Sequence, residues 1–120
     1  MNFFLPFVLT IVLLAIWADV ASAKPRKAEV ASWYGEELRG RLTANGEKFD
    51  PDALTCASWD YPFGTKLRVS HGGKSVIVRV NDRGPSKQFL VRTIDLSREA
   101  FRRLAPLEEG LIGVTITPVK

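Results

Sequence analysis

The sequence has one cysteine and one histidine among its 120 residues. A single cysteine, Cys56, excludes an intramolecular disulfide, so burial and backbone hydrogen bonds must hold the fold together. The apolar residues around Cys56 predict a buried, unreactive thiol. A single histidine, His71, cannot form a histidine-based metal cluster. Its glycine neighbours predict a solvated turn residue, which would not serve a Ser-His-Asp triad. Since a glycine-rich nucleotide loop is also missing, we expect no metal and no cofactor.

Long apolar runs are scarce, and the one clear case lies near the N-terminus. Residues 3–18 are uncharged, and the small side chains of Ala21 and Ala23 follow them, which is typical of a secretory signal cleaved after Ala23. The run is about 16 residues long, whereas a membrane-spanning helix needs roughly 20. We expect residues 1–23 to be a signal peptide and residues 24–28 a linker, with export to the periplasm or cell envelope. An uncleaved anchor is the alternative, because no basic residue precedes the run, and no nearby cysteine supports lipid attachment.

Acidic side chains are outnumbered, with 13 Asp and Glu against 17 Lys and Arg. All the basic residues and 12 of the acidic ones follow residue 23, so the exported part carries a formal charge of +5. An exported basic protein is expected to meet anionic wall polymers or membrane surfaces, and we expect no nucleic-acid partner. The alternative is that a charge of this size only aids solubility. We expect a monomer.

Short alternating segments dominate the 97 residues after the signal. The patterns predict a helical turn at residues 50–54, a helix at 97–105 that Ser97 caps and Pro106 ends, and strands at residues 29–34, 66–70, 75–81, 91–96 and 110–119. A Gly-Gly turn joins the second and third of these strands into a hairpin. Several short strands and one helix in so short a chain predict an all-β fold, a small barrel that leaves few exposed strand edges.

Six segments occur in an order that carries a family resemblance. They are residues 31–35 (ASWYG), 43–50 (TANGEKFD), 53–55 (ALT), 62–65 (PFGT), 80–85 (VNDRGP) and 94–97 (IDLS). Together they resemble the RlpA-like (rare lipoprotein A) domain across residues 29–120. The resemblance implies a six-stranded double-psi β-barrel, which the family shares with expansins and small endoglucanases. Family members include septal-ring lytic transglycosylases, which cleave peptidoglycan glycan between N-acetylmuramic acid and N-acetylglucosamine and leave 1,6-anhydro ends.

Three carboxylates are candidates for this chemistry. Glycosidic cleavage needs an acid for the leaving oxygen and stabilisation of an oxocarbenium-like centre. The resemblance places Asp82 on the family's catalytic aspartate and Glu47 on a functionally important glutamate, so both are expected to be catalytic. It places Asp95 on an aspartate that faces the glycan groove of expansin-like barrels, where it would bind substrate. The structural alternatives are a turn cap for Asp82, a solvated loop acid for Glu47 and a helix-start acid for Asp95.

Ser58 marks a departure from the family pattern. RlpA domains usually have a histidine shortly before the Pro-Phe-Gly-Thr turn, and Ser58 occupies that place here. A serine can bind substrate through hydrogen bonds but cannot carry charge near neutral pH. The imidazole that would tune nearby carboxylates or orient substrate is therefore missing.

Aromatic and basic side chains supply further candidates for substrate binding. Tyr34 and Trp59 are expected to be partly exposed, where flat rings stack on sugars, while Trp33 is expected in or near the core. Arg83 could meet the lactyl carboxylates of muramic acid, as could Arg79 and Arg92. The alternatives are core packing for the rings and solvated barrel faces for the arginines.

Two functions remain open at this stage. The first is an endolytic peptidoglycan lytic transglycosylase that acts on glycan strands, with Asp82 as acid and base. The second is a non-catalytic, expansin-like module that binds peptidoglycan or another polysaccharide and loosens the wall. Retention of Asp82 and Glu47 favours the enzyme, whereas Ser58 and the absence of an additional glycan-binding domain from the sequence favour the module. A partner among divisome or other cell-envelope proteins is left open.

Overall fold

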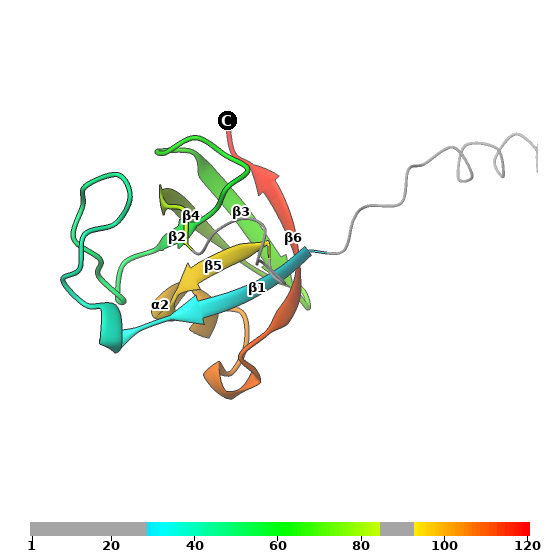
Figure 1. Ribbon diagram of the computed structural model, residues 1–120. Coiled ribbons are helices and arrows are strands. Elements are labelled where there is room, and N and C mark those ends of the chain that lie inside the picture. Colours follow the sequence, from blue (N-terminus) through cyan, green and yellow to red (C-terminus); the bar gives the residue numbers. More distant parts are fainter. Residues whose placement is uncertain (1–28, 85–92) are drawn as a thin grey trace, which may run out of the picture.

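The computed structural model describes residues 29–84 and 93–120 and folds them into one closed barrel with a short helix (Figure 1). The strands are β1 (Glu29–Tyr34), β2 (Thr55–Ala57), β3 (Lys66–His71), β4 (Lys74–Asp82), β5 (Ile94–Ser97) and β6 (Ile112–Pro118). The helical elements are η1 (Glu36–Leu38), α2 (Arg98–Arg102) and η3 (Leu107–Glu109). The predicted signal peptide and linker, Arg92 and the start of the strand predicted at 91–96 lie outside the described residues.

The strands close into a barrel in the order β1-β5-β2-β4-β3-β6, with β6 returning to β1. Two neighbouring pairs are parallel, β1 with β5 and β2 with β4, and the other four are antiparallel. This closed six-stranded barrel confirms the predicted double-psi β-barrel. Closure also pairs both edges of every strand, so none offers a template for aggregation.

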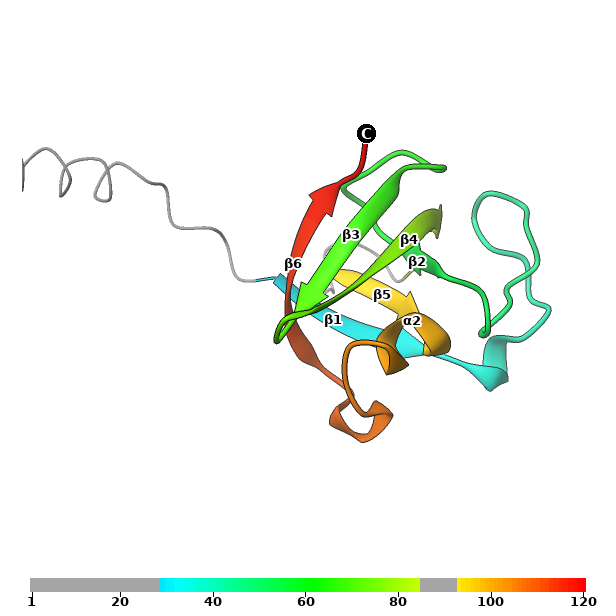
Figure 2. The same cartoon turned by 180° about the vertical axis from the view of Figure 1, so that it is seen from behind.

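The β3–β4 hairpin supplies much of the core because its side chains alternate as the sequence predicts. Leu67 lies opposite Val78, and Val69 lies opposite Val76, with all four side chains buried inside the barrel. Figure 2 shows β3 and β4 side by side, with β6 beyond β3. The two turn glycines both have positive φ, which matches the right-handed twist of the strands they join.

The helix begins where the sequence predicts and ends earlier. The Ser97 hydroxyl accepts a hydrogen bond from the Ala100 amide at 3.3 Å and so caps α2. Regular helix stops at Arg102 rather than Ala105. The turn tightens there, because the Leu104 amide donates to the Phe101 carbonyl oxygen at 2.9 Å, three residues back, instead of continuing the α-helical pattern. Phe101, which α2 carries, is fully buried against the barrel.

Three local expectations need correction. The predicted helical turn at 50–54 is a tight turn, in which the Asp50 carboxylate accepts the Asp52 amide at 2.9 Å, and no helix follows. His71 ends β3 with Nδ1 2.7 Å from the Gly113 carbonyl oxygen, so it is not a freely solvated turn residue. Strand β2 was not predicted from the sequence pattern, because its three residues are buried on both faces and show no alternation.

Within residues 29–84 and 93–120, no helix has the length and hydrophobicity that would let it cross a membrane.

Candidate functional site

A pocket of about 460 Å³ opens between β1, β2, the end of β4 and β5. Its lining consists of Ser32, Trp33, Tyr34, Leu38, Ala57, Asp82, Gly84 and Asp95. The barrel thus brings together three residues that the sequence singled out, namely Tyr34, Asp82 and Asp95. They come from separate strands, and pairing of β1 with β5 sets Tyr34 two residues beyond the position opposite Asp95.

A β-bulge sets the position of Asp82. The register between β2 and β4 shifts after Cys56, so that Ala57 lies opposite Asp82 rather than Asn81. Such a bulge redirects the side chains that follow it. The Ser58 amide then donates to the Asp82 carbonyl oxygen at 3.0 Å and holds the end of β4 in place.

The two oxygens of the Asp82 carboxylate have different surroundings. Oδ1 accepts hydrogen bonds from the backbone amides of Arg83, at 2.8 Å, and Ala44, at 3.1 Å. Oδ2 takes no hydrogen bond from residues 29–84 and 93–120. Of the two oxygens, Oδ2 is therefore the one left to interact with a ligand.

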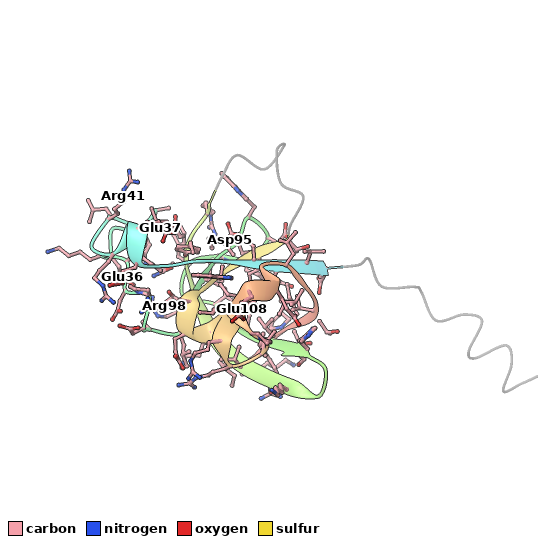
Figure 3. All side chains as sticks on the ribbon, turned by 90° about the horizontal axis from the view of Figure 1, so that it is seen from below. Glu36, Glu37, Arg41, Asp95, Arg98 and Glu108 are labelled. Atoms are coloured by element: carbon pink, nitrogen blue, oxygen red, sulfur yellow. The ribbon has the colours of Figure 1, made fainter. Side chains whose placement is uncertain are left out.

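Asp95 is the more deeply buried of the two pocket acids, with 8% of its surface exposed. It lies opposite Ser32, whose hydroxyl donates a hydrogen bond to Asp95 Oδ1. Figure 3 shows Asp95 on β5, whereas the acidic side chains of Glu36 and Glu37 lie on η1 beyond the end of β1. A carboxylate held this way can supply negative charge to the pocket wall.

Gly84 allows the backbone to pass close to Asp95. Its φ is +72°, and a Cβ at this position would lie 3.0 Å from Asp95 Oδ2. A side chain here would be strained by the backbone and would crowd the acid. The glycine therefore keeps the space beside Asp95 open.

Tyr34 contributes a neutral hydroxyl to the site. The residue is partly exposed, as predicted, but the hydroxyl is buried without a hydrogen-bond partner in the described residues. Burial raises the tyrosine pKa well above its usual value, and the charge of Asp82 adds to the shift. Its ring packs on Phe49 with centroids 4.5 Å apart. Because a buried, unpaired hydroxyl is unfavourable, Tyr34 is a candidate donor to a ligand.

Glu47 lies outside the pocket lining, in an ion pair with Arg79. The guanidinium donates two hydrogen bonds, to Oε1 at 2.6 Å and to Oε2 at 2.8 Å. These bonds, with a further one from the Asn45 amide group at 2.8 Å, lower the Glu47 pKa to about 2. Glu47 is therefore ionised near neutral pH and cannot supply a proton there.

Ser58 and Arg83 are also placed away from the pocket lining. Ser58 is buried, and its hydroxyl oxygen accepts the Asp60 amide at 3.1 Å. Arg83 donates to the carbonyl oxygens of Ser58 at 2.6 Å and Tyr61 at 2.8 Å, while its guanidinium lies 3.9 Å from the centre of the Phe63 ring. These contacts shape the segment of residues 58–63 beside the site.

Trp33 and Trp59 lie as the sequence predicts. Trp59 is 40% exposed, and it stands outside the lining of the pocket. Trp33 packs at the edge of the core, 6.4 Å from Phe101 between ring centres, and its indole nitrogen donates to the Leu107 carbonyl oxygen at 3.0 Å. Trp33 is also among the residues that line the pocket.

Three contributors to the site were not predicted from the sequence. Ser32 shares a strand face with Tyr34, and the alternation of β1 could have identified it. Gly84 could have been noticed as a glycine that follows the Asn-Asp-Arg segment. Ala44 acts through its backbone amide, for which the sequence carries no signal.

Cys56 and metal-binding groups do not add to the site. Burial raises the pKa of the Cys56 thiol to about 12, which keeps it protonated and confirms the expected buried, unreactive cysteine. Across the two described ranges, no cluster of three or more His, Cys, Asp or Glu side chains could hold a metal ion.

Comparison with known proteins gives the same family as the six sequence segments. Residues 26–116 match the family model described as lytic transglycolase. A probable endolytic peptidoglycan transglycosylase RlpA from Synechocystis is 41% identical over 97% of this chain, which spans 36% of that relative's length.

Two solved structures share the fold, Streptomyces papain inhibitor and an apo-expansin of Clavibacter michiganensis. The inhibitor has a TM-score of 0.63 and 29% identity, and the match covers 82% of this chain and 98% of the inhibitor. The expansin has a TM-score of 0.61 and 28% identity, with 78% of this chain and 50% of the expansin covered.

Proposed function

The chain belongs to the lytic transglycolase family of double-psi β-barrels, and on that premise we propose that it is an endolytic peptidoglycan lytic transglycosylase. The glycan strand would bind in the pocket between β1, β4 and β5. We further propose that residues 1–23 direct export and that the enzyme works as a monomer in the periplasm or cell envelope.

The observation that carries the proposal is the placement of Asp82. Its carboxylate lines a pocket, with Oδ1 held by two backbone amides and Oδ2 left for a proton. A second acid, Asp95, lines the same pocket and is fixed by Ser32. An acid with one defined proton-bearing oxygen beside an anionic wall suits glycosidic cleavage.

The reaction would proceed with one carboxyl group in two roles. Protonated Asp82 gives its proton to the glycosidic oxygen as the bond from that oxygen to C1 of the muramic acid breaks. The sugar's own 6-hydroxyl then attacks C1 and gives its proton to the Asp82 carboxylate, so the acid is restored and no water is consumed. The negative charge of Asp95 would stabilise the oxocarbenium-like centre between these events.

The remaining candidates have supporting roles in this proposal. The neutral Tyr34 hydroxyl would donate a hydrogen bond to the bound sugar, and the exposed Trp59 ring would stack on a neighbouring sugar outside the pocket. Ser58 and Arg83 would act on substrate through the segment they shape rather than by contact within the pocket.

Product analysis of an Asp82 variant tests the function. Wild-type chain incubated with stem-free glycan strands should release 1,6-anhydro ends detectable by mass spectrometry. Asp82→Asn removes the transferable proton but keeps the size of the side chain, and it should lower the rate by a factor of at least about 100. Glu99→Gln, a surface change on α2, is the control and should cleave as wild type does. Unchanged cleavage by Asp82→Asn would refute the assignment of Asp82.

The non-catalytic module is the second candidate. The similarity to an expansin and the serine at position 58 favour it. Under this alternative, wild-type chain would sediment with stem-free glycan and release no anhydro ends. Binding that Asp82→Asn and wild type share, without products from either, would replace the enzyme with this module.

A further inference from the structure

The loop of residues 43–47 carries the amide that binds Asp82, and it is closed mainly by its own hydrogen bonds. The Thr43 amide donates to the Glu47 carbonyl oxygen at 2.7 Å, and the Gly46 amide donates to the Thr43 carbonyl oxygen at 3.0 Å. Figure 1 shows the segment between η1 and β2 reaching out beside the barrel. Because the loop closes on itself, its position over Asp82 depends on the few bonds that tie it to β4.

Those ties come from Asn81 and Asp82 at the end of β4 and from Arg79. The Asn81 carbonyl oxygen accepts the Asn45 amide at 3.2 Å, and the Asn81 side-chain amide donates to Glu47 Oε2 at 3.4 Å. Arg79 donates the two shorter bonds to Glu47, at 2.6 and 2.8 Å. Bidentate arginine–carboxylate bonds are the strongest and most directional of these ties.

The ion pair between Glu47 and Arg79 also offsets a repulsion between basic side chains. Arg79 lies directly opposite Lys66 on β3, and like charges in that arrangement repel. Glu47 is the acid that the described residues place against Arg79. Neither member of the pair lines the pocket, so the pair can influence a ligand there through the loop alone.

We propose that Arg79 is a positioning residue, which holds Glu47 so that the loop presents the Ala44 amide to Asp82 Oδ1. The inference rests on the proposed function for its catalytic consequence. With Oδ1 held by Ala44 and Arg83, the proton of Asp82 stays on Oδ2. When the Ala44 bond is lost, the Arg83 amide alone holds Oδ1, so the carboxyl group is less firmly oriented and its proton is directed less strictly toward the pocket. The pair thus acts on the rate of the chemical step rather than on sugar binding.

Two readouts on Arg79→Gln test the proposal. Hydrogen exchange of the Ala44 amide should become about tenfold faster, since a charge-assisted tie of the loop is lost. The value of kcat on stem-free glycan should fall about tenfold, while KM should stay within about twofold, because only an interaction made in the transition state is weakened. Arg79→Lys, which keeps the charge but not the bidentate geometry, should recover part of the loss.

Glu99→Gln provides the matched control. Glu99 accepts two bonds from Arg102, at 2.8 and 2.7 Å, and its pKa is also lowered to about 2, but it lies on α2 away from the pocket. It should leave Ala44 exchange, kcat and KM as in wild type. If Arg79→Gln does not fold, the same readouts on Arg79→Lys decide, with smaller effects of the same sign.

The outcomes separate this inference from the proposed function. Unchanged Ala44 exchange in a folded Arg79 variant overturns the positioning role, as does faster exchange with unchanged kcat. If wild-type chain cleaves no glycan, the proposed function fails. Faster Ala44 exchange in Arg79→Gln would still support the structural half of the inference in that case, and unchanged exchange would overturn it.

Discussion

Single residues shape the site through backbone atoms as much as through charges. The proton-bearing oxygen of Asp82 is selected by two amides, one from its chain neighbour and one from Ala44, 38 positions away. Asp95 is fixed by a serine hydroxyl, and the room beside it exists because residue 84 has no side chain. The chemistry of the pocket therefore depends on small residues that carry no ionisable group.

Gly84→Ala tests this dependence against a matched glycine. The change should lower the free energy of unfolding by about 1–2 kcal/mol, because alanine is strained at positive φ. Gly73→Ala carries a similar strain at φ +82° but meets nothing within 4 Å, so it should cost similar stability. Chemical denaturation measures both. Only Gly84→Ala should also lose glycan cleavage, since its Cβ crowds Asp95. Equal glycan cleavage by the two variants would contradict the claim that glycan is cleaved in this pocket.

At the scale of elements, the barrel supplies the rigid frame and the loop of residues 43–47 is an attachment to it. Strands β1, β4 and β5 carry the acids and the tyrosine, and hydrogen bonds to neighbouring strands fix each of them. The loop is held to β4 largely by one ion pair. As the pH falls, the attachment of this loop to β4 should therefore weaken before the barrel itself unfolds.

The Glu47–Arg79 pair predicts a defined pH dependence. The folded-state pKa of Glu47 is about 2 against an ordinary value of 4.5, so the pair stabilises the fold above pH 4.5 and its contribution is lost as pH falls toward 2. The melting temperature of Glu47→Gln should lie below that of wild type at pH 6, and the gap should close by about pH 2. The effect is small because the pair is partly exposed. A gap that does not change with pH would mean that the charge of Glu47 is not what holds the loop.

The elements differ in how far the sequence predicts them. Strands β3 and β4 were predicted because each buries one face, which leaves an alternating pattern. Strand β2 was missed because burial on both faces removes that pattern. The end of α2 was misplaced because its last turn tightens after Arg102, for which the sequence carries no signal. The pocket acids were predicted from their motifs. The pairing of Glu47 with Arg79 was not predicted, because 32 positions separate the two residues and only the barrel brings them together.

At the scale of the whole barrel, closure of the described strands brings three of the predicted site residues, Tyr34, Asp82 and Asp95, to one pocket. The hairpin of β3 and β4 has exposed polar and basic positions and contributes core residues, whereas β1, β2, β5 and the end of β4 line the pocket. A glycan that the enzyme cuts, or that a non-catalytic module binds, should thus contact the same side of the barrel.

Mapping the glycan on the folded chain by NMR tests the central claim most directly. Isotope-labelled Asp82→Asn chain, which should bind strands without cutting them, is titrated with stem-free glycan. We predict that the backbone amides of Tyr34, Ala44 and Gly84 shift, while the hairpin amides of Gly72 and Gly73 do not. Shifts confined to the β3–β4 hairpin, with the pocket signals unchanged, would contradict the claim that this pocket holds the glycan.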